Sequence, residues 1–153
     1  MKDLALEYAN KPEGWFFIGG QTGAGKTHIC VAIVQRLIER SGKMEYFRWV
    51  DDSKRLKAIA NEQTREEELK RYKEADILYI DDFLKIAPTE ADRALAFEII
   101  NGAYAIGQRL IISSEKTLHE IDCWDGAIAG RIRERAGKYW ATLTGAEKNY
   151  RAK

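Results

Sequence analysis

The sequence is poor in cysteine and histidine, with two of each, and it contains no long hydrophobic segment. Neither Cys30 nor Cys123 stands at a spacing typical of a metal site, and His119 has no obvious ligand partner. We find no zinc cluster and no catalytic triad, and we expect two free thiols in a reducing cytoplasm, with Cys30 in the core. No apolar run approaches the length of a membrane span, and the N-terminus lacks a signal-peptide hydrophobic region. We therefore expect a cytoplasmic protein with no membrane partner.

The sequence also lacks a strong net charge, because 25 lysines and arginines face 24 acidic residues. A net charge of +1 creates no global field toward nucleic acid or membrane, so any such contact requires a local patch. There is no internal repeat, low-complexity segment or linker. A chain of 153 residues that is 45% hydrophobic can build a real core, and we expect residues 1–153 to form a single domain.

One glycine-rich stretch fits a phosphate-binding loop. The stretch is Gly20-Gln21-Thr22-Gly23-Ala24-Gly25-Lys26-Thr27, which matches G-x-x-x-x-G-K-[ST], the Walker A motif. The apolar run 15–18 before it indicates a buried strand, and residues 29–38 after it indicate a helix. A strand, a glycine loop and a helix are the context that this motif requires.

The residue types of this loop suit the phosphates of ATP or ADP. Gly20, Gly23 and Gly25 allow positive φ, so that successive N–H groups can form a nest for phosphate oxygens. The helix that begins near Lys26 adds its positive N-terminal end. Lys26 can reach the β- and γ-phosphates, and the Thr27 hydroxyl can ligate Mg²⁺. The alternative is a glycine turn with an incidental lysine.

His28 follows the loop directly, and we expect it to be structural or to lie near the edge of the nucleotide.

A second apolar segment, residues 75–80, ends in Asp81 and Asp82 and indicates a strand covered on both faces of a sheet. Asp81 can hold Mg²⁺ alongside Thr27, and Asp82 can orient or polarise the attacking water. The alternative for both aspartates is a helix cap or a turn. Roughly 50 residues separate the two motifs, which leaves room for an intervening strand, as in the additional-strand (ASCE) class of P-loop ATPases.

Two further groups are candidates for acting on the γ-phosphate. Ser113 and Ser114 end the apolar segment 109–114, and a polar group there can sense that phosphate; ordinary turn chemistry is the alternative. Arg131 and Arg135 share a helix face at i,i+4, and a cation accelerates phosphoryl transfer when it meets the developing charge. Because they lie so far along the chain, we expect them to serve a neighbouring subunit's site; a solvated basic face is the alternative.

The rest of the chain alternates between helical and strand patterns. We expect helices over residues 2–10, from the phosphate loop to about 41, from 54 onward, 65–74, 89–106 and 124–136, and strands over residues 46–50, 75–82, 109–114 and 138–144. Asp51-Asp52-Ser53 is expected to cap the helix that starts at Lys54. This alternation predicts an α/β fold with a parallel sheet and right-handed crossovers.

Five motifs, taken together, support a resemblance to a known family. They are Gly20–Thr27, Ile80-Asp81-Asp82-Phe83, Ile111-Ile112-Ser113-Ser114, Gly130-Arg131-Ile132, and Leu143-Thr144-Gly145 with Asn149-Tyr150-Arg151. In these motifs the chain resembles the AAA+ ATPase domain of bacterial and phage DnaC/DnaI-type helicase loaders, and IstB-type transposition helper ATPases look similar. The resemblance covers nearly the whole chain. The first two motifs are specific only to P-loop ATPases, and the others narrow the resemblance to this clade.

The resemblance implies a P-loop NTPase fold with a five-stranded parallel sheet in the order 5-1-4-3-2, flanked by helices. It implies an extra helix within residues 54–74, no C-terminal helical lid, and Arg131 as an arginine finger acting in trans. It also implies an ATP-dependent helical or ring assembly on single-stranded DNA. Relatives carry an N-terminal segment that grips the helicase. Little chain precedes Trp15 here, so we expect that segment to have been cut away or to be lacking.

The chain departs from the family pattern at two positions of the site. Many relatives end the sensor strand in Asn, where this chain has Glu115. A carboxylate there repels a γ-phosphate, so we expect the sensor role to pass to Ser114 or Ser113. Many AAA+ proteins carry Glu at the second acidic position of the Walker B motif, and Asp82 is one methylene shorter.

Contacts with single-stranded DNA need cations combined with aromatic stacking. Our first choice is the group formed by Trp49, Lys54, Arg55 and Lys57, and the alternative is an ordinary solvated helix. Lys148, Arg151 and Lys153 form a basic tail that we expect only to aid solubility. Trp124 and Trp140 are expected in the core.

The sequence thus predicts a Mg-dependent ATPase that assembles on single-stranded DNA and loads a replicative helicase. Its catalytic groups are expected to be Lys26, Asp82, Ser114 and a neighbour's Arg131. The first alternative is an IstB-like transposition helper that delivers a transposase. The second is a nucleotide-dependent, single-stranded-DNA-binding switch with negligible turnover.

Overall fold

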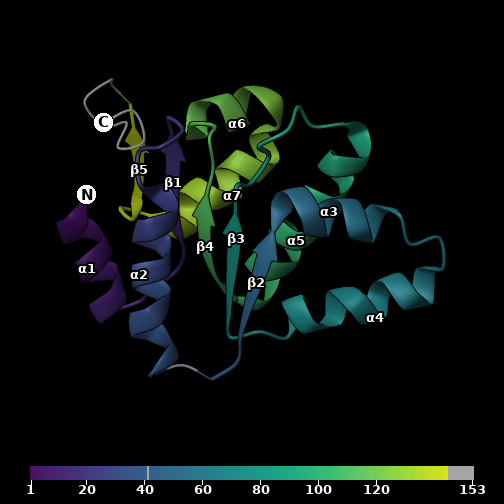
Figure 1. The fold of residues 1–153 in the computed structure, drawn as a ribbon, viewed down its shortest axis with the longest axis horizontal. Coiled ribbons are helices and arrows are strands. Elements are labelled where there is room, and N and C mark those ends of the chain that lie inside the picture. The colour runs from purple at the N-terminus through teal and green to yellow at the C-terminus, as the bar shows by residue number, and fades with distance from the viewer. Residues whose placement is uncertain (41, 145–153) are drawn as a thin grey trace.

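The computed structural model describes residues 1–40 and 42–144 (Figure 1). In chain order the elements are α1 (Lys2–Asn10), β1 (Phe16–Gly20), α2 (Lys26–Ile38), β2 (Met44–Arg48), α3 (Trp49–Lys57), α4 (Glu62–Lys73), β3 (Ile77–Asp81), α5 (Glu90–Ile106), β4 (Arg109–Ser113), α6 (Leu118–Trp124), α7 (Gly126–Ala136) and β5 (Trp140–Leu143). Strands and helices alternate along most of the chain, as the sequence predicts.

The described strands form one parallel sheet in the order β2-β3-β4-β1-β5. This is the expected order 5-1-4-3-2 read from the other edge, so the prediction is confirmed. Strand β4 lies between β1 and β3, with Ile18 opposite Ser113 and Ile80 opposite Ile112. The carboxyl ends of the two motif-bearing strands therefore meet at the same edge of the sheet, with the end of β4 between them.

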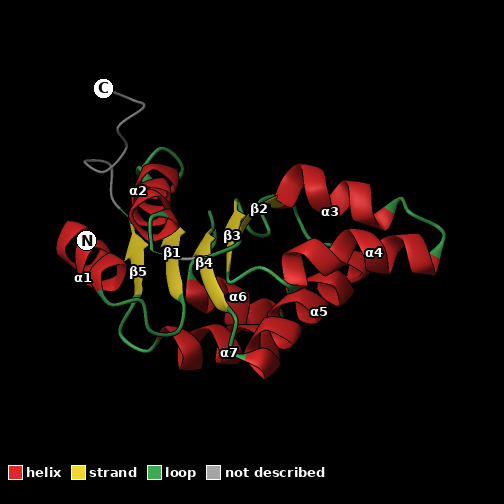
Figure 2. Ribbon diagram, turned by 90° about the horizontal axis from the view of Figure 1, so that it is seen from below, coloured by secondary structure: helices red, strands yellow, loops and turns green. Residues whose placement is uncertain are grey.

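Helices cover both faces of the sheet (Figure 2). Alternate residues of β1, β3 and β4 pack into different halves of the core. On β3, Ile77 and Tyr79 face helices α1 and α2, whereas Leu78 and Ile80 face the core shared with α5 and α7. This two-residue period follows from strand geometry, and burial on both faces explains why β3 is apolar almost throughout. Helices α3 and α4 extend beyond the β2 edge of the sheet (Figure 1).

Local capping signals define the α5 boundaries as expected. Thr89 and Asp92 form a reciprocal capping box at its start, and Gly107 ends it in the left-handed conformation with φ of 70°. The same capping pattern, Thr117 with Glu120, begins α6, which our sequence analysis missed although its T-x-x-E signal is present.

The expectation for the second strand is wrong at its end. Strand β2 ends at Arg48, and Trp49 begins α3, so residues 51–53 lie inside the helix instead of capping it. Trp49 is buried and packs edge-on against Phe83, and the Asp52 carboxylate accepts a hydrogen bond of 2.7 Å from the Arg48 backbone N–H. Tertiary burial and this local bond thus override the β-propensity of an aromatic, β-branched pair.

The other expectations for the core have mixed outcomes. Cys30 is fully buried, and Trp124 is partly buried against the core, as predicted. Trp140 is 40% exposed because β5 is an edge strand, so its assignment to the core is wrong.

Three expectations concern residues outside the described part of the chain. They are the basic tail, residues 145 and 149–151 of the last motif, and the lack of a C-terminal lid. Within the described part of the chain, no helix has both the length and the hydropathy needed to cross a membrane.

Candidate nucleotide-binding and hydrolysis site

A cavity of about 980 Å³ lies at the carboxyl edge of the sheet, over the glycine loop. Its wall includes loop residues 22–28 and, from the β3 side, Asp81, Asp82, Lys85 and Glu115. On the other side it runs between α1 and α2, where side chains such as Leu6 and Ile29 form an apolar lining. The cavity therefore combines a polar end, suited to phosphates, with an apolar end that a nucleobase can occupy.

The loop backbone has the conformation that its glycines predict. Gly20, Gly23 and Gly25 have φ of 114°, 78° and 84°. A Cβ on Gly20 would come within 2.3 Å of the Leu143 carbonyl oxygen, because Gly20 ends β1 and is paired with Leu143 of the neighbouring strand β5. Gly25 is the N-cap of α2, so the positive end of the helix opens into the cavity. This backbone fits the phosphate groups of a nucleotide.

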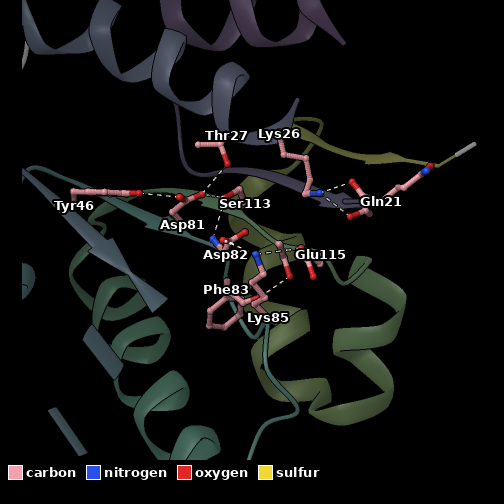
Figure 3. A network of polar contacts seen from close by, with 12 residues as sticks. Gln21, Lys26, Thr27, Tyr46, Asp81, Asp82, Phe83, Lys85, Ser113 and Glu115 are labelled. Carbon is pink, nitrogen blue, oxygen red and sulfur yellow. Dashed lines mark hydrogen bonds and ion pairs between the residues drawn. The ribbon is translucent and has the colours of Figure 1, made fainter. Parts of the chain in front are cut away.

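Lys26 lies across the loop that precedes it. Its amino group donates hydrogen bonds to the carbonyl oxygens of Gly20, at 2.7 Å, and Gln21, at 2.6 Å (Figure 3). The residue is 7% exposed and lines the cavity. A buried ammonium group held by carbonyl dipoles at the mouth of a phosphate nest gives the site a fixed positive charge.

Asp81 receives hydrogen bonds from four hydroxyl groups. Figure 3 shows three of the donors, Thr27, Tyr46 and Ser113. Ser113, Tyr79 and Thr27 donate to Oδ1 at 2.6, 2.8 and 3.2 Å, and Tyr46 donates to Oδ2 at 2.8 Å. Burial acts to raise the pKa of Asp81, but these donors outweigh it and hold the pKa below its ordinary value. Asp81 is therefore an oriented carboxylate anion at neutral pH.

The two predicted Mg²⁺ ligands, Thr27 and Asp81, thus lie in direct contact although 54 positions separate them. Hydroxyl and carboxylate oxygens are hard donors, which suits Mg²⁺ bound partly by substrate phosphates and water. Among the described residues no cluster of three His, Cys, Asp or Glu could hold a metal by itself.

Asp82 lies next to this pair, on a strained backbone with φ of 55°. Its carboxylate lies 3.2 Å from the Lys85 amino group, which is also 3.4 Å from Glu115. Our sequence analysis missed Lys85, although its position three residues after Asp82 is a signal that could have revealed the ion pair. Glu115 does line the cavity, as its position suggested, but the cation of Lys85 offsets its charge.

The two candidate sensor serines are both buried, at 1% and 0% exposure, and neither lines the cavity. Ser113 donates to Asp81 and accepts a 3.2 Å hydrogen bond from the Asp82 backbone N–H. Ser114 donates to the Phe83 carbonyl oxygen at 2.6 Å. These contacts fix the carboxyl ends of β3 and β4 relative to each other. A catalytic role for Ser114 stays a prediction.

Arg131 and Arg135 lie on α7, across the sheet from α2 and the cavity (Figure 2). Arg131 donates to the Asn101 side chain at 3.0 Å, and its guanidinium lies over the rings of Phe97 and Tyr104. Arg135 donates to the Tyr104 carbonyl oxygen. Neither arginine lines the cavity of its own chain, so an action on that nucleotide would have to come from another subunit.

The proposed DNA-contacting group is largely engaged within the fold. The Arg55 guanidinium pairs with Glu68 at 2.6 Å, and the Lys57 amino group pairs with Asp92 at 2.5 Å. Trp49 is 3% exposed, so it is not available to stack on bases. Lys54 is exposed and remains the candidate cation of this helix.

The statement that His119 lacks a partner is wrong. Cys123 lies one helical turn away, and its Sγ is 3.7 Å from His119 Nε2. Both cysteines are free thiols, as expected. No third metal-ligating group joins this pair within the described part of the chain.

Comparison with known proteins shows the family of this chain. The family described as "IstB-like ATP binding protein" matches residues 1–148. The uncharacterized protein YqaM of Bacillus subtilis strain 168 is 33% identical over 133 residues, which cover 82% of this chain and 42% of that relative. The chain spans about half the length of the curated relatives it matches.

Solved structures share the fold at low sequence identity. A structure titled "Crystal structure of the DnaC helicase loader" matches with a TM-score of 0.76 and 21% identity, covering 92% of this chain and 86% of that one. One titled "Replication initiator DnaA bound to AMPPCP and single-stranded DNA" matches with a TM-score of 0.77 and 21% identity, covering 96% and 46%. With its phosphate loop, its oriented Asp81 and its sheet order, the chain belongs to the IstB-like ATP-binding family and has the AAA+ P-loop fold.

Proposed function

We propose that this chain is a cytoplasmic Mg-dependent ATPase that assembles on single-stranded DNA and loads a replicative helicase. The observation that carries the proposal is the contact between Thr27 and Asp81, with Asp82 next along the chain, in the cavity that holds the phosphate loop. In P-loop ATPases, groups of these three kinds must lie close together for phosphoryl transfer to water.

The contacts within the site support a role for each of its side chains. Loop N–H groups and Lys26 would bind the phosphates. Thr27 and Asp81 would hold Mg²⁺, which would supply positive charge against the phosphates. Ser113 orients Asp81 and, through the Asp82 backbone, the carboxylate that positions the attacking water. A neighbour's Arg131 supplies the cation for the developing charge, and this requires self-association in a helix or ring.

The loading role is supported by the fold shared with the DnaC helicase loader, and the DNA role by the fold shared with DnaA bound to single-stranded DNA. The family match itself favours a second candidate, an IstB-like transposition helper that delivers a transposase. A third candidate is a nucleotide-dependent, single-stranded-DNA-binding switch with negligible turnover.

ATP turnover per subunit, measured across protein concentrations with and without single-stranded DNA, tests the proposal. A specific activity that rises with both supports sites completed between subunits. A flat, background rate despite nucleotide binding favours the switch. The Asp82→Asn variant is the control, because unchanged turnover would remove Asp82 from the mechanism. Parallel pull-downs with a replicative helicase and a transposase distinguish the first two candidates.

A further inference from the structure

The loop that follows Asp81 is held rigidly in a conformation that side chains rarely adopt. Asp82 and Leu84 have φ of 55° and 58°, and a bulky residue such as leucine pays a steric cost in this region. The loop is nevertheless fixed: Phe83 N–H donates to the Ser113 carbonyl at 2.8 Å, and Phe83 and Leu84 are fully buried. Strain of this kind persists where the surroundings enforce it, often at functional sites.

The result of this fixed loop is that Lys85 extends along the cavity wall. Its amino group lies between two carboxylates, 3.2 Å from Asp82 and 3.4 Å from Glu115 (Figure 3). The three side chains are 39%, 34% and 27% exposed, so this ion-pair cluster is only half-buried. All three residues line the same cavity as the phosphate loop.

The charges of this wall explain why a cation is needed there. Asp81, Asp82 and Glu115 place three carboxylates on one side of the cavity, where a γ-phosphate adds further negative charge. The hydrogen bond to Asp82, with the nearby carboxylate of Glu115, raises the pKa of Lys85, so the amino group is charged at neutral pH. Lys26 lies on the opposite, loop side, bonded to the Gly20 and Gln21 carbonyls.

We propose that Lys85 is the residue that distinguishes ATP from ADP: its amino group exchanges Asp82 for an oxygen of the γ-phosphate. This inference rests on the proposed binding of ATP in the cavity. In the absence of a γ-phosphate, the Lys85 amino group forms an ion pair with the Asp82 carboxylate. When a γ-phosphate is bound, Lys85 pairs with the phosphate, and the Asp82 carboxylate is free to orient the attacking water. The Lys85 side chain thereby links the presence of a γ-phosphate to the release of the Asp82 carboxylate for hydrolysis.

The geometry favours an exchange over a fixed structural bridge. Half-exposed ion pairs contribute little free energy, so breaking one contact to form a charge-assisted bond to phosphate is favourable. Lysine carries its charge on a flexible four-carbon stem, whereas the backbone beneath it is fixed by buried neighbours. The moving part is therefore a single amino group.

Equilibrium binding of the non-hydrolysable triphosphate AMPPCP and of ADP, both with Mg²⁺, tests this proposal without relying on turnover. We expect Lys85→Met to weaken AMPPCP binding by about tenfold and to change ADP binding less than about twofold, as for the loss of one charge-assisted bond. The matched control is Lys70→Met, which removes an exposed ion pair with Glu74 on α4 and is expected to change neither.

A second variant distinguishes direct recognition from simple neutralisation of Glu115. If Lys85 contacts the phosphate, the double variant Lys85→Met/Glu115→Gln keeps a preference for AMPPCP that is weaker than that of the wild type, because the lost charge-assisted bond is not replaced. Glu115→Gln alone strengthens the preference. A double variant that regains the wild-type preference would overturn the proposal, as would equal losses for both nucleotides in Lys85→Met. If the wild-type protein binds neither nucleotide, the proposed ATP function fails as well, and this outcome is distinct from the other two.

Discussion

The phenolic hydroxyl of Tyr46 donates a 2.8 Å hydrogen bond to Oδ2 of Asp81, from a neighbouring strand and 35 positions away in sequence. Tyr46 stands opposite Tyr79 in the β2–β3 register, and the two rings stack with centroids 5.2 Å apart. Tyr79 donates to the other carboxylate oxygen of Asp81. The two stacked tyrosines thus donate hydrogen bonds to both oxygens of the Asp81 carboxylate and set its orientation toward Thr27.

Replacing Tyr46 with Phe is expected to weaken the binding of the Mg²⁺ that supports ATP turnover, while leaving the fold intact. The ring still stacks on Tyr79, but Oδ2 of Asp81 loses its donor. Outer-shell partners of metal ligands typically contribute tenfold or more, so the Mg²⁺ concentration for half-maximal turnover should rise by about tenfold. Tyr104→Phe is the control, because it removes a hydroxyl that bonds Glu134 far from the cavity. Identical Mg²⁺ titrations for the two variants would refute a positioning role.

A second pair, Lys57 with Asp92, connects α3 to the start of α5. Burial acts to raise the pKa of Asp92, but the hydrogen bonds from Lys57 and Thr89 hold it below the ordinary value of 3.8. Because the folded pKa is lower than the unfolded one, the carboxylate stabilises the fold above pH 3.8. That contribution is lost as the pH falls through the lower, folded pKa.

Asp92→Asn is therefore expected to lower the free energy of unfolding by about 1–2 kcal/mol at pH 7, and by less at pH 3. Urea denaturation at the two pH values measures both differences. Glu90→Gln serves as the control, since that carboxylate is 87% exposed on the same helical turn. A destabilisation by Asp92→Asn that is equal at both pH values would show that its charge contributes nothing.

Much of the fold was predictable because its signals are local. The continuous apolar run of β3 reflects burial on both faces, and the Thr89 capping box and Gly107 bound α5 as the pattern indicates. The glycine loop determines its own backbone, so its φ values also follow from the sequence. These features need no knowledge of which distant segments meet.

Helix α6 was missed although its capping signal is local, whereas three other features depend on distant contacts. Trp49 has strand propensity, but its burial against Phe83 makes it the first residue of a helix. Tyr46 reaches Asp81 only because β2 pairs with β3 in one register, and no local pattern reveals that register. Lys85 faces the cavity because the preceding loop is held by Ser113, the last residue of β4, and by Ser114, which follows it.

The close approach of Gly20, where the phosphate loop begins, to Leu143 of β5 makes a prediction about stability. Gly20→Ala would place an alanine at a φ of 114°, with its Cβ 2.3 Å from the Leu143 carbonyl oxygen. Both conflicts involve the backbone, so a change of side-chain rotamer cannot relieve either of them. We expect the free energy of unfolding to fall by at least about 2 kcal/mol. Gly102→Ala, within α5, meets nothing within 4 Å and should raise it by roughly 0.5–1 kcal/mol. Thermal and urea denaturation of the two variants check the opposite signs, and a neutral Gly20→Ala would show that the loop shifts freely away from β5.

The position of Arg131 on the far side of the sheet makes a prediction about cooperation between subunits. Arg131→Ala should lower ATP turnover by about 10³-fold or more if the arginine completes a neighbour's site, and Asp82→Asn should be similarly inactive. Mixing the two inactive variants should restore part of the activity, because an intact Asp82 on one subunit can meet an intact Arg131 on the next. Arg133→Ala, which removes an ion pair between α7 and Asp122 of α6, should behave like the wild type. If the mixture stays as inactive as its components while both bind nucleotide and associate, Arg131 does not act across the interface, and its bond to Asn101 is then its main role.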